Sequence, residues 1–496
     1  MSGDRDSCAG THLGVGFRFP AYIPVIAEFT LPDFELYTYF STVKDRKHLF
    51  FLESLTGDEH ARYSMLGYDP LLVMESREGS VRVDDRASFL NLNTDIFSLQ
   101  RAVLQAQLPE LTVDVPHFYG GLVGYWGYDL ALATEGITRV NRPVPALPDA
   151  AFFLPRIVVV HDRHTSTVRV FGFYPAGSQE EPTVWKQVQE TVRAVTESAR
   201  HPVIRRPGRT SRQAEDGFTS NTSGVEFLDM VARAQRYINR GDIFQVVLSQ
   251  RWRKHTRASP EDVYAELRDL NPSPYMFYLR FPGYTLVGSS PEMMVRVEGD
   301  RVQTRPIAGT RPVTGDAERD AALRRELLED VKERAEHLML VDLGRNDVGK
   351  VSRPGTVRVG EFMKVEAYSH VVHLVSTVEG RLRPGEDGLS ALRACYPAGT
   401  LTGAPKRRAM EIIDQLEKDP RGPYGGAVGY VGLNGCLDSC ITIRSILFRN
   451  GCCYLQAGAG IVADSVPRNE YRETVNKARA LMKAVLNAEG SHDTDD

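Results

Sequence analysis

Residues 427–463 read AVGYVGLNGCLDSCITIRSILFRNGCCYLQAGAGIVA, and this stretch decides the fold class. Its apolar, partly alternating runs AVGYVGL, ITIRSILF and CYLQAGAGIVA are separated by turns at Asn434-Gly435 and Asn450-Gly451. Asn-Gly between such runs is a strong signal for a β-hairpin. The stretch therefore predicts an antiparallel meander.

An arginine and two glycines within this meander suggest an anion site. Thr442, Arg444 and Ile446 share one strand face by the two-residue period, and a mid-strand arginine among apolar neighbours needs an anion. Gly458 and Gly460 also share a face, where a ligand could approach the bare backbone. The alternatives are an internal salt bridge for the arginine and a bulge or tight helix packing for the glycines.

Outward from the meander, the chain divides into a strand-rich N-terminal half and a mixed C-terminal half. Residues 1–200 contain short runs such as HLFFLES, SVRVDD and AFFLPRIVVVHD, and residues 201–224 are polar and aperiodic, as expected of a linker. Residues 225–490 combine both periods, which predicts an α/β fold of the α+β type. The expected helices are 225–240, 317–341, 403–417 and 468–488, and further strands are 243–250 and 275–280.

The bulk composition excludes several classes of protein. The 496 residues are 42% hydrophobic and 25% charged with a net charge of −4, so nothing points to nucleic acid or an anionic membrane. No apolar stretch is long enough for a membrane span, no signal peptide is recognisable, and six cysteines are too few for a disulfide framework. We therefore expect a cytoplasmic protein.

Two glutamate pairs have the same spacing, Glu333-x-x-Glu336 and Glu470-x-x-Glu473. Spacing of i, i+3 places both carboxylates of a pair on one side of a helix. Four carboxylates converging from two helices would suit Mg²⁺. The alternative is a solvated face, because the 317–341 helix has an apolar stripe that lies opposite Glu333 and Glu336. That stripe consists of Leu327, Leu328, Val331, Ala335 and Leu338.

Several longer runs together carry a family resemblance. They are PIAGT (306–310), ERAEHLMLVDLGRND (333–347), VEAYSHVVHLVS (365–376), YPAGTLTGAPKRRAME (396–411), RGPYGGAVGY (421–430) and QAGAGIVADSVPRNEYRETVNKA (456–478). The chain resembles the chorismate-utilising enzymes, and most closely their anthranilate synthase large-component branch. The resemblance is continuous from about residue 226 to 488 and weaker in FFLES and RYSMLGYDP. It implies a large two-lobed sandwich of antiparallel β-sheets with helices packed between them, and a chorismate-binding catalytic domain over 225–490.

The resemblance also implies roles for individual residues. Glu336 and Glu473 would hold Mg²⁺, with Glu333 and Glu470 supporting them through water. Glu292 in SSPEMM would be the general acid that protonates the leaving hydroxyl, although a lone glutamate is more often a surface residue. His373 would serve the later elimination. The residues implied to bind chorismate are Gly309, Thr310, Thr400, Tyr424, Arg444, Gly458, Ala459 and Gly460, and Thr310 is also implied in catalysis.

Two positions select the nucleophile within this family. Branches that make aminodeoxychorismate carry a lysine at the centre of the PIAGT loop, where this chain has Ala308; branches that add water carry a lysine where this chain has Gln245. Neither residue can act as a nucleophile or as a base. The resemblance therefore implies anthranilate synthesis from chorismate and ammonia through aminodeoxyisochorismate, the first committed step of tryptophan biosynthesis.

No glutaminase motif is recognisable, so a separate glutamine amidotransferase subunit would supply the ammonia in a hetero-oligomer. The alternatives are an aminodeoxychorismate, isochorismate or salicylate synthase, or a non-catalytic tryptophan-binding regulator.

A second site is implied by FFLES and NPSPYMFYL. In the family, the matching residues form a tryptophan feedback pocket, here Glu53, Ser54, Pro274, Tyr275 and Met276. Glu53 would pair with the ligand's ammonium and Met276 would contact its indole. The alternative for NPSP is a stiff turn at the entry of a strand.

Overall fold

The computed structural model describes residues 19–56, 62–84, 89–92, 94–105, 116–138, 147–203, 215–367 and 371–492. The expected linker at 201–224 therefore lies partly outside the described residues. The helices are α1 Leu36–Val43, α2 Ile96–Leu104, α3 Tyr128–Thr134, α4 Glu181–Ala199, α5 Gly224–Asn239, α6 Pro260–Leu270, α7 Ala317–Glu329, α8 Val331–Gly349, α9 Gly388–Cys395, the 3₁₀ helix η1 Gly399–Leu401, α10 Lys406–Leu416 and α11 Pro467–His492.

The strands of the first half are β1 Tyr22–Thr30, β2 Leu49–Glu53, β3 Tyr63–Arg77, β4 Ser80–Asp84, β5 Phe89–Leu92, β6 Gly121–Trp126, β7 Ala150–Asp162 and β8 Thr167–Pro175. Those of the second half are β9 Thr219–Ser220, β10 Gln245–His255, β11 Tyr275–Phe281, β12 Tyr284–Ser290, β13 Met293–Glu298, β14 Arg301–Thr304, β15 Ile307–Pro312, β16 Arg358–Val359, β17 Lys364–Ala367, β18 Val371–Val375, β19 Val378–Arg381, β20 Gly403–Ala404, β21 Ala427–Gly432, β22 Leu437–Ile441, β23 Ser445–Arg449 and β24 Cys452–Ile461.

The predicted meander forms with both hairpin turns in place, but it has four strands. Gly435 has a φ of +81°, and Asn450 and Gly451 have φ values of +50° and +70°. These left-handed conformations are what tight hairpin turns require. The run ITIRSILF is not one strand, because β22 ends at Ile441 and β23 begins at Ser445.

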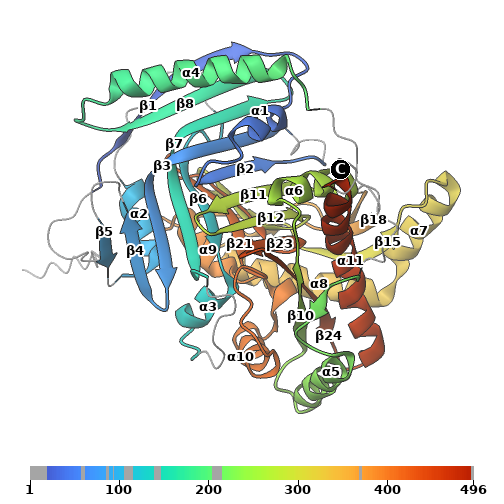
Figure 1. Ribbon diagram of the computed structural model, residues 1–496. Coiled ribbons are helices and arrows are strands. Elements are labelled where there is room, and N and C mark those ends of the chain that lie inside the picture. Colours follow the sequence, from blue (N-terminus) through green and yellow to red (C-terminus); the bar gives the residue numbers. More distant parts are fainter. Residues whose placement is uncertain are drawn as a thin grey trace, which may run out of the picture.

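Strands from the two halves of the sequence pair with each other. β2 pairs with β11 and β6 pairs with β21, and every strand pairing found among the described residues is antiparallel. The main hydrophobic core likewise contains residues of both halves, for example Phe153 and Val428. The strands fan through the body of the molecule, and helices pack against them, among them α1 and α6, most of whose residues are buried (Figure 1). The expected class of large antiparallel sheets with packed helices is confirmed.

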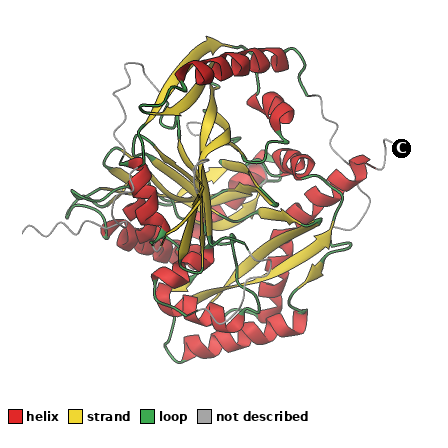
Figure 2. Cartoon of the chain, turned by 60° about the vertical axis from the view of Figure 1, so that its left-hand side comes forward, coloured by secondary structure: helices red, strands yellow, loops and turns green. Residues whose placement is uncertain are grey.

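The helices cover distinct parts of this sheet. α4 packs on β1 and β8 at one end of the molecule, and α11 packs on β24, α5 and α6 (Figures 1 and 2). A small separate sheet of β15, β18 and β17 carries α7 and α8 beside it. Among the described residues, no helix combines the length and apolar character needed to span a membrane.

The predicted helix 317–341 is two helices, and the expected apolar stripe is wrong. Asp330 ends α7 and caps α8, because its side chain accepts hydrogen bonds from the backbone N–H groups of Lys332 and Glu333. The break changes which residues face inward: Leu327 is buried, whereas Val331 is 81% and Leu338 47% exposed. A solvated face for the two glutamates of this helix therefore no longer follows from the pattern.

Candidate active site

The PIAGT loop is held in a bulge of the small sheet. Ala308 pairs with Leu374 and Arg311 with Val372, so Gly309 and Thr310 lie in the irregular step opposite His373. Gly309 has a φ of +67°, and a Cβ there would lie 2.8 Å from Leu327 Cδ1. Only glycine fits this conformation without strain. The bulge and the packing against Leu327 therefore restrict the conformation that this loop can adopt.

The bulge orients His373. The imidazole Nδ1 lies 2.8 Å from the Gly309 carbonyl oxygen and 3.2 Å from Thr310 Oγ1. A carbonyl only accepts, so Nδ1 carries the proton and Nε2 carries the lone pair of the neutral ring. Burial lowers the pKa of His373, and the nearby positive charge of Arg444 lowers it further. The ring is thus neutral at pH 7 and can accept a proton at Nε2.

Glu292 is buried in the turn between β12 and β13. It is 8% exposed, and its Oε1 accepts a hydrogen bond of 3.1 Å from Thr400 Oγ1 in η1. Burial raises the pKa of Glu292 to about 8, although the Thr400 hydrogen bond and the charge of Lys477 oppose the rise. A carboxyl with this pKa is mostly protonated at pH 7 and can serve as a general acid. It is not the surface glutamate that its lone position in sequence suggested.

The two glycines of β24 leave room for side chains that cross the strand face. A Cβ on Gly458 would lie 3.0 Å from Tyr424 Oη, and a Cβ on Gly460 would lie 2.7 Å from Gln245 Nε2. β24 pairs with β10, with Ala459 opposite Leu248. The bare backbone, Tyr424 and Gln245 therefore form one wall.

Arg444 lies in the break between β22 and β23 rather than on a strand face. Its φ of +51° is uncommon for a residue with a side chain, and its Nη1 donates to the Lys477 carbonyl oxygen at 2.8 Å. Among the described residues, no ion pair involving Arg444 is found. Burial lowers the pKa of Arg444, while Tyr424 and the charge of Glu473 raise it. The expectation of an arginine on a continuous strand is wrong, but its place beside the predicted substrate residues is retained.

Glu333 and Glu336 lie on α8, Glu470 and Glu473 lie on α11, and the charge of Glu473 acts on Glu336. Burial raises the pKa of Glu336, and the carboxylates of Glu333 and Glu473 raise it further. Burial also raises the pKa of Glu470, and Glu473 adds to this. Within the described part of the chain, no three acidic, histidine or cysteine side chains are already arranged to hold a metal ion. The charges of these acids therefore affect one another's pKa values, but the side chains do not form a closed set of metal ligands.

Lys477 is a residue of this site that the sequence patterns did not single out. It is one turn after Glu473 on α11, and its Nζ lies 2.6 Å from Glu473 Oε1 and 3.1 Å from the Gly458 carbonyl oxygen. The i, i+4 spacing after Glu473 was the available signal.

Arg311 is a second missed residue, and it fixes Glu333. Its guanidinium pairs with Glu326 at 2.8 Å, Asp330 at 2.8 Å and Glu333 at 3.2 Å. It thereby ties the bulged loop to the start of α8.

A separate cavity of about 290 Å³ is lined by all five residues of the predicted tryptophan pocket. These are Glu53, Ser54, Pro274, Tyr275 and Met276. The size is at the lower end of small-molecule sites, which are roughly 300–1,000 Å³. Tyr275 Oη donates to Asp438 at 3.1 Å on one wall. The cavity lies where β2 and β11 pair, so it is built from both halves of the chain.

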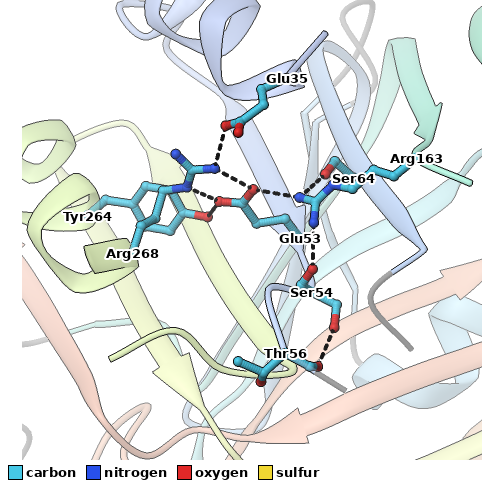
Figure 3. A network of polar contacts seen from close by, with 8 residues as sticks. All are labelled: Glu35, Glu53, Ser54, Thr56, Ser64, Arg163, Tyr264 and Arg268. Carbon is cyan, nitrogen blue, oxygen red and sulfur yellow. Dashed lines mark hydrogen bonds and ion pairs between the residues drawn. The ribbon is translucent and has the colours of Figure 1, made fainter. Parts of the chain in front are cut away.

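Glu53 is the hub of a polar network beside this cavity (Figure 3). Its carboxylate accepts from Arg268 Nε at 2.7 Å, from Tyr264 Oη at 2.8 Å and from Arg163 Nη2 at 3.1 Å. Ser54 contributes its carbonyl to Arg163 at 2.8 Å. The carboxylate already has two guanidinium partners, so the ammonium of a ligand would share it with Arg163 and Arg268.

Comparison with known proteins decides the family. The family described as chorismate binding enzyme matches residues 48–483. The chain belongs to the chorismate binding enzyme family. It is 45% identical over 465 residues to anthranilate synthase component 1 of Acetivibrio thermocellus, covering 90% of this chain and 92% of the relative. It is 44% identical over 450 residues to that of Aquifex aeolicus (89% of this chain, 90% of the relative).

Solved structures agree with this placement. Anthranilate synthase component I from Streptococcus pneumoniae superposes with a TM-score of 0.76 at 35% identity, covering 87% of this chain and 94% of that chain. MenF, the menaquinone-specific isochorismate synthase of Escherichia coli, matches with a TM-score of 0.72 at 20% identity, covering 94% of this chain and 95% of that chain. The second likeness shows a shared fold alone.

Proposed function

We propose that this chorismate binding enzyme converts chorismate and ammonia into anthranilate, pyruvate and water. The observation that carries the proposal is that the chain has both a buried carboxylic acid and a neutral imidazole, and has no lysine at positions 308 and 245. Burial raises the pKa of Glu292 to about 8, and His373 presents Nε2 as a proton acceptor. Ala308 and Gln245 stand where the other branches carry lysine.

In the first half-reaction, ammonia adds at C2 of chorismate while the C4 hydroxyl leaves. Hydroxide is a poor leaving group, so the Glu292 proton goes to that oxygen and water departs. Thr400 orients the Glu292 carboxyl through its hydrogen bond. Arg444 and the amides of Gly458 to Gly460 would bind the substrate carboxylates.

In the second half-reaction, the aminodeoxyisochorismate intermediate loses pyruvate and becomes aromatic. His373 Nε2 takes the proton from C2, the electron pair forms the ring double bond, and the ether C–O bond breaks. The departing enolpyruvate takes a proton from solvent and becomes pyruvate. Gly309 and Thr310 fix the imidazole for this step.

Glu336 and Glu473 would hold Mg²⁺, with Glu333 and Glu470 in support. The residues fit the ion because all four donors are carboxylates, the ligands that Mg²⁺ prefers, and because burial and then the neighbouring carboxylates raise the pKa of Glu336 and Glu470. When bound, Mg²⁺ would stabilise negative charge on the ring carboxylate. Removal of the ion with EDTA should abolish turnover, and added Mg²⁺ should restore it.

We also propose that tryptophan binds in the 290 Å³ cavity and inhibits by favouring a state that binds chorismate poorly. A separate glutamine amidotransferase subunit would supply ammonia, because neutral ammonia is scarce at pH 7.

The test is a product assay with chorismate, Mg²⁺ and ammonium, read by fluorescence and chromatography. Anthranilate and pyruvate in equal amounts are expected, and glutamine should not replace ammonium for the isolated chain. Formation of aminodeoxychorismate, isochorismate or salicylate instead would overturn the proposal. Turnover of the isolated chain with glutamine would overturn the partner assignment alone.

A further inference from the structure

A single ammonium group lies at the junction of the acids and the substrate wall. Lys477 Nζ is 2.6 Å from Glu473 Oε1 and 3.1 Å from the carbonyl oxygen of Gly458. Its charge also lowers the pKa of Glu292, Glu336 and Glu470, so it is felt by acids from three separate segments. Both Lys477 and Glu473 are about half-buried, with side chains 40% and 45% exposed.

A second lysine provides a comparison. Lys332 precedes Glu333 on α8, and its charge lowers the pKa of the same two acids, Glu336 and Glu470. Its Nζ, however, faces Asp464 at 3.9 Å. The two lysines therefore act on the same acids at a distance, but Lys477 is hydrogen-bonded to one of the four and Lys332 is paired elsewhere.

The geometry points to a specific role: we propose that Lys477 is the counter-cation of Glu473 when no metal ion is bound, and that Mg²⁺ displaces its ammonium from Glu473. The proposal rests on the proposed assignment of Glu336 and Glu473 as metal ligands. One carboxylate oxygen cannot keep a 2.6 Å contact to an ammonium and also bind Mg²⁺ at about 2.0–2.1 Å without the two cations crowding each other. When Mg²⁺ takes the Oε1 atom of Glu473, Lys477 must move.

The displaced ammonium has a second partner nearby. It already donates to Gly458, the first residue of the wall that is proposed to receive the substrate. Once released from Glu473, the ammonium lies beside that wall, where it can pair with a carboxylate of chorismate. Metal binding would thus prepare chorismate binding through Lys477, and by linkage chorismate would tighten metal binding by the same factor.

Direct metal binding tests this role without relying on turnover. Mn²⁺, which also favours carboxylate ligands, is titrated into the full-length chain and followed by electron paramagnetic resonance. Lys477→Met removes the competing cation, so we expect Mn²⁺ to bind roughly three- to fivefold more tightly, as for loss of an exposed ion pair. Lys477→Arg keeps a cation and should restore the weaker affinity. Lys332→Met is the matched control and should change the affinity less than twofold.

Coupling to substrate gives the second readout. With chorismate present and ammonium absent, wild-type Mn²⁺ affinity should rise at least fivefold, and this gain should be lost in Lys477→Met. Equal tightening in the Lys477→Met and Lys332→Met variants would show that only general electrostatics operates and would overturn the proposal. So would unchanged or weaker Mn²⁺ binding in Lys477→Met, or retained coupling.

The metal assignment itself is checked separately. If Glu336→Gln and Glu473→Gln both leave wild-type Mn²⁺ binding unchanged, the proposed metal site fails whatever the lysine does. If they weaken it while Lys477→Met has no effect, the lysine role alone fails. Thermal unfolding of each variant without metal confirms that the chain is folded during the titration.

Discussion

Glu292→Gln is expected to remove most of the activity and to stabilise the protein at the same time. Glutamine keeps the volume and can still accept from Thr400, but it has no proton to give to the leaving hydroxyl. General acids contribute about 10²- to 10⁴-fold, so kcat with ammonium should fall by that range. The KM for chorismate should change much less.

The stability change follows from the pKa of about 8, which lies above the ordinary value of 4.5. The folded chain therefore holds this proton more tightly than the unfolded chain. The contribution to stability is fully present below pH 4.5, declines as the pH rises, and is lost above about pH 8. The difference corresponds to an upper figure of about 5 kcal/mol. The melting temperature of Glu292→Gln should match wild type near pH 4 and exceed it at pH 8.5.

The pH profile completes this experiment. Rates referred to the concentration of neutral ammonia should fall above about pH 8 in wild type, as Glu292 loses its proton. The Thr400 hydrogen bond favours the charged carboxylate and so lowers the pKa of Glu292. Thr400→Val should therefore shift the fall in rate to higher pH. Activity of Glu292→Gln within threefold of wild type, or a flat wild-type profile from pH 7.5 to 9.5, would refute the assignment.

Three further changes test other parts of the site. His373→Gln should accumulate aminodeoxyisochorismate, detected by chromatography, because only the second half-reaction needs Nε2; simple loss of both steps would count against this role. Ser54→Phe should fill the 290 Å³ cavity, so tryptophan inhibition should weaken at least tenfold while the uninhibited rate is kept, and equal inhibition would place the effector elsewhere. Gly309→Ala should lower kcat and the melting temperature, because its φ is +67° and its Cβ would meet Leu327 Cδ1 at 2.8 Å; wild-type values would show that the loop is not held as described.

The sequence predicted the strands and turns well where local chemistry decides them. The Asn-Gly pairs gave both hairpins, and helix 225–240 appears as α5 within one residue, with Ser223 and Glu226 forming a capping box. The strand expected at 275–280 is β11. These elements depend on turn residues and caps that act over a few positions.

Prediction from the sequence failed where apolar periodicity concealed a short-range signal, or where no local signal existed. The apolar spacing of 317–341 concealed the break at Asp330, although Asp330-x-x-Glu333 is itself a helix-start signal. The sheet order across the two halves, with β2 against β11, had no local signal at all. The three partners of Glu53 also had no local signal in the sequence, because each lies more than 100 residues away from it.

Two departures from the periodic pattern, at Arg444 and at Glu336, lie at the candidate site, and one physical reason accounts for both. Periodicity describes where side chains go when burial alone decides, whereas Arg444 and Glu336 are placed against that preference. Arg444 keeps a guanidinium half-buried at a φ of +51°, and Glu336 keeps a carboxylate where burial and two neighbouring carboxylates raise its pKa. Each arrangement costs stability in the unliganded chain, so only a gain in the liganded state explains why it is kept. In the proposed function a doubly anionic substrate would offset the first cost and a divalent cation the second, which would tie the two departures from pattern to one reaction.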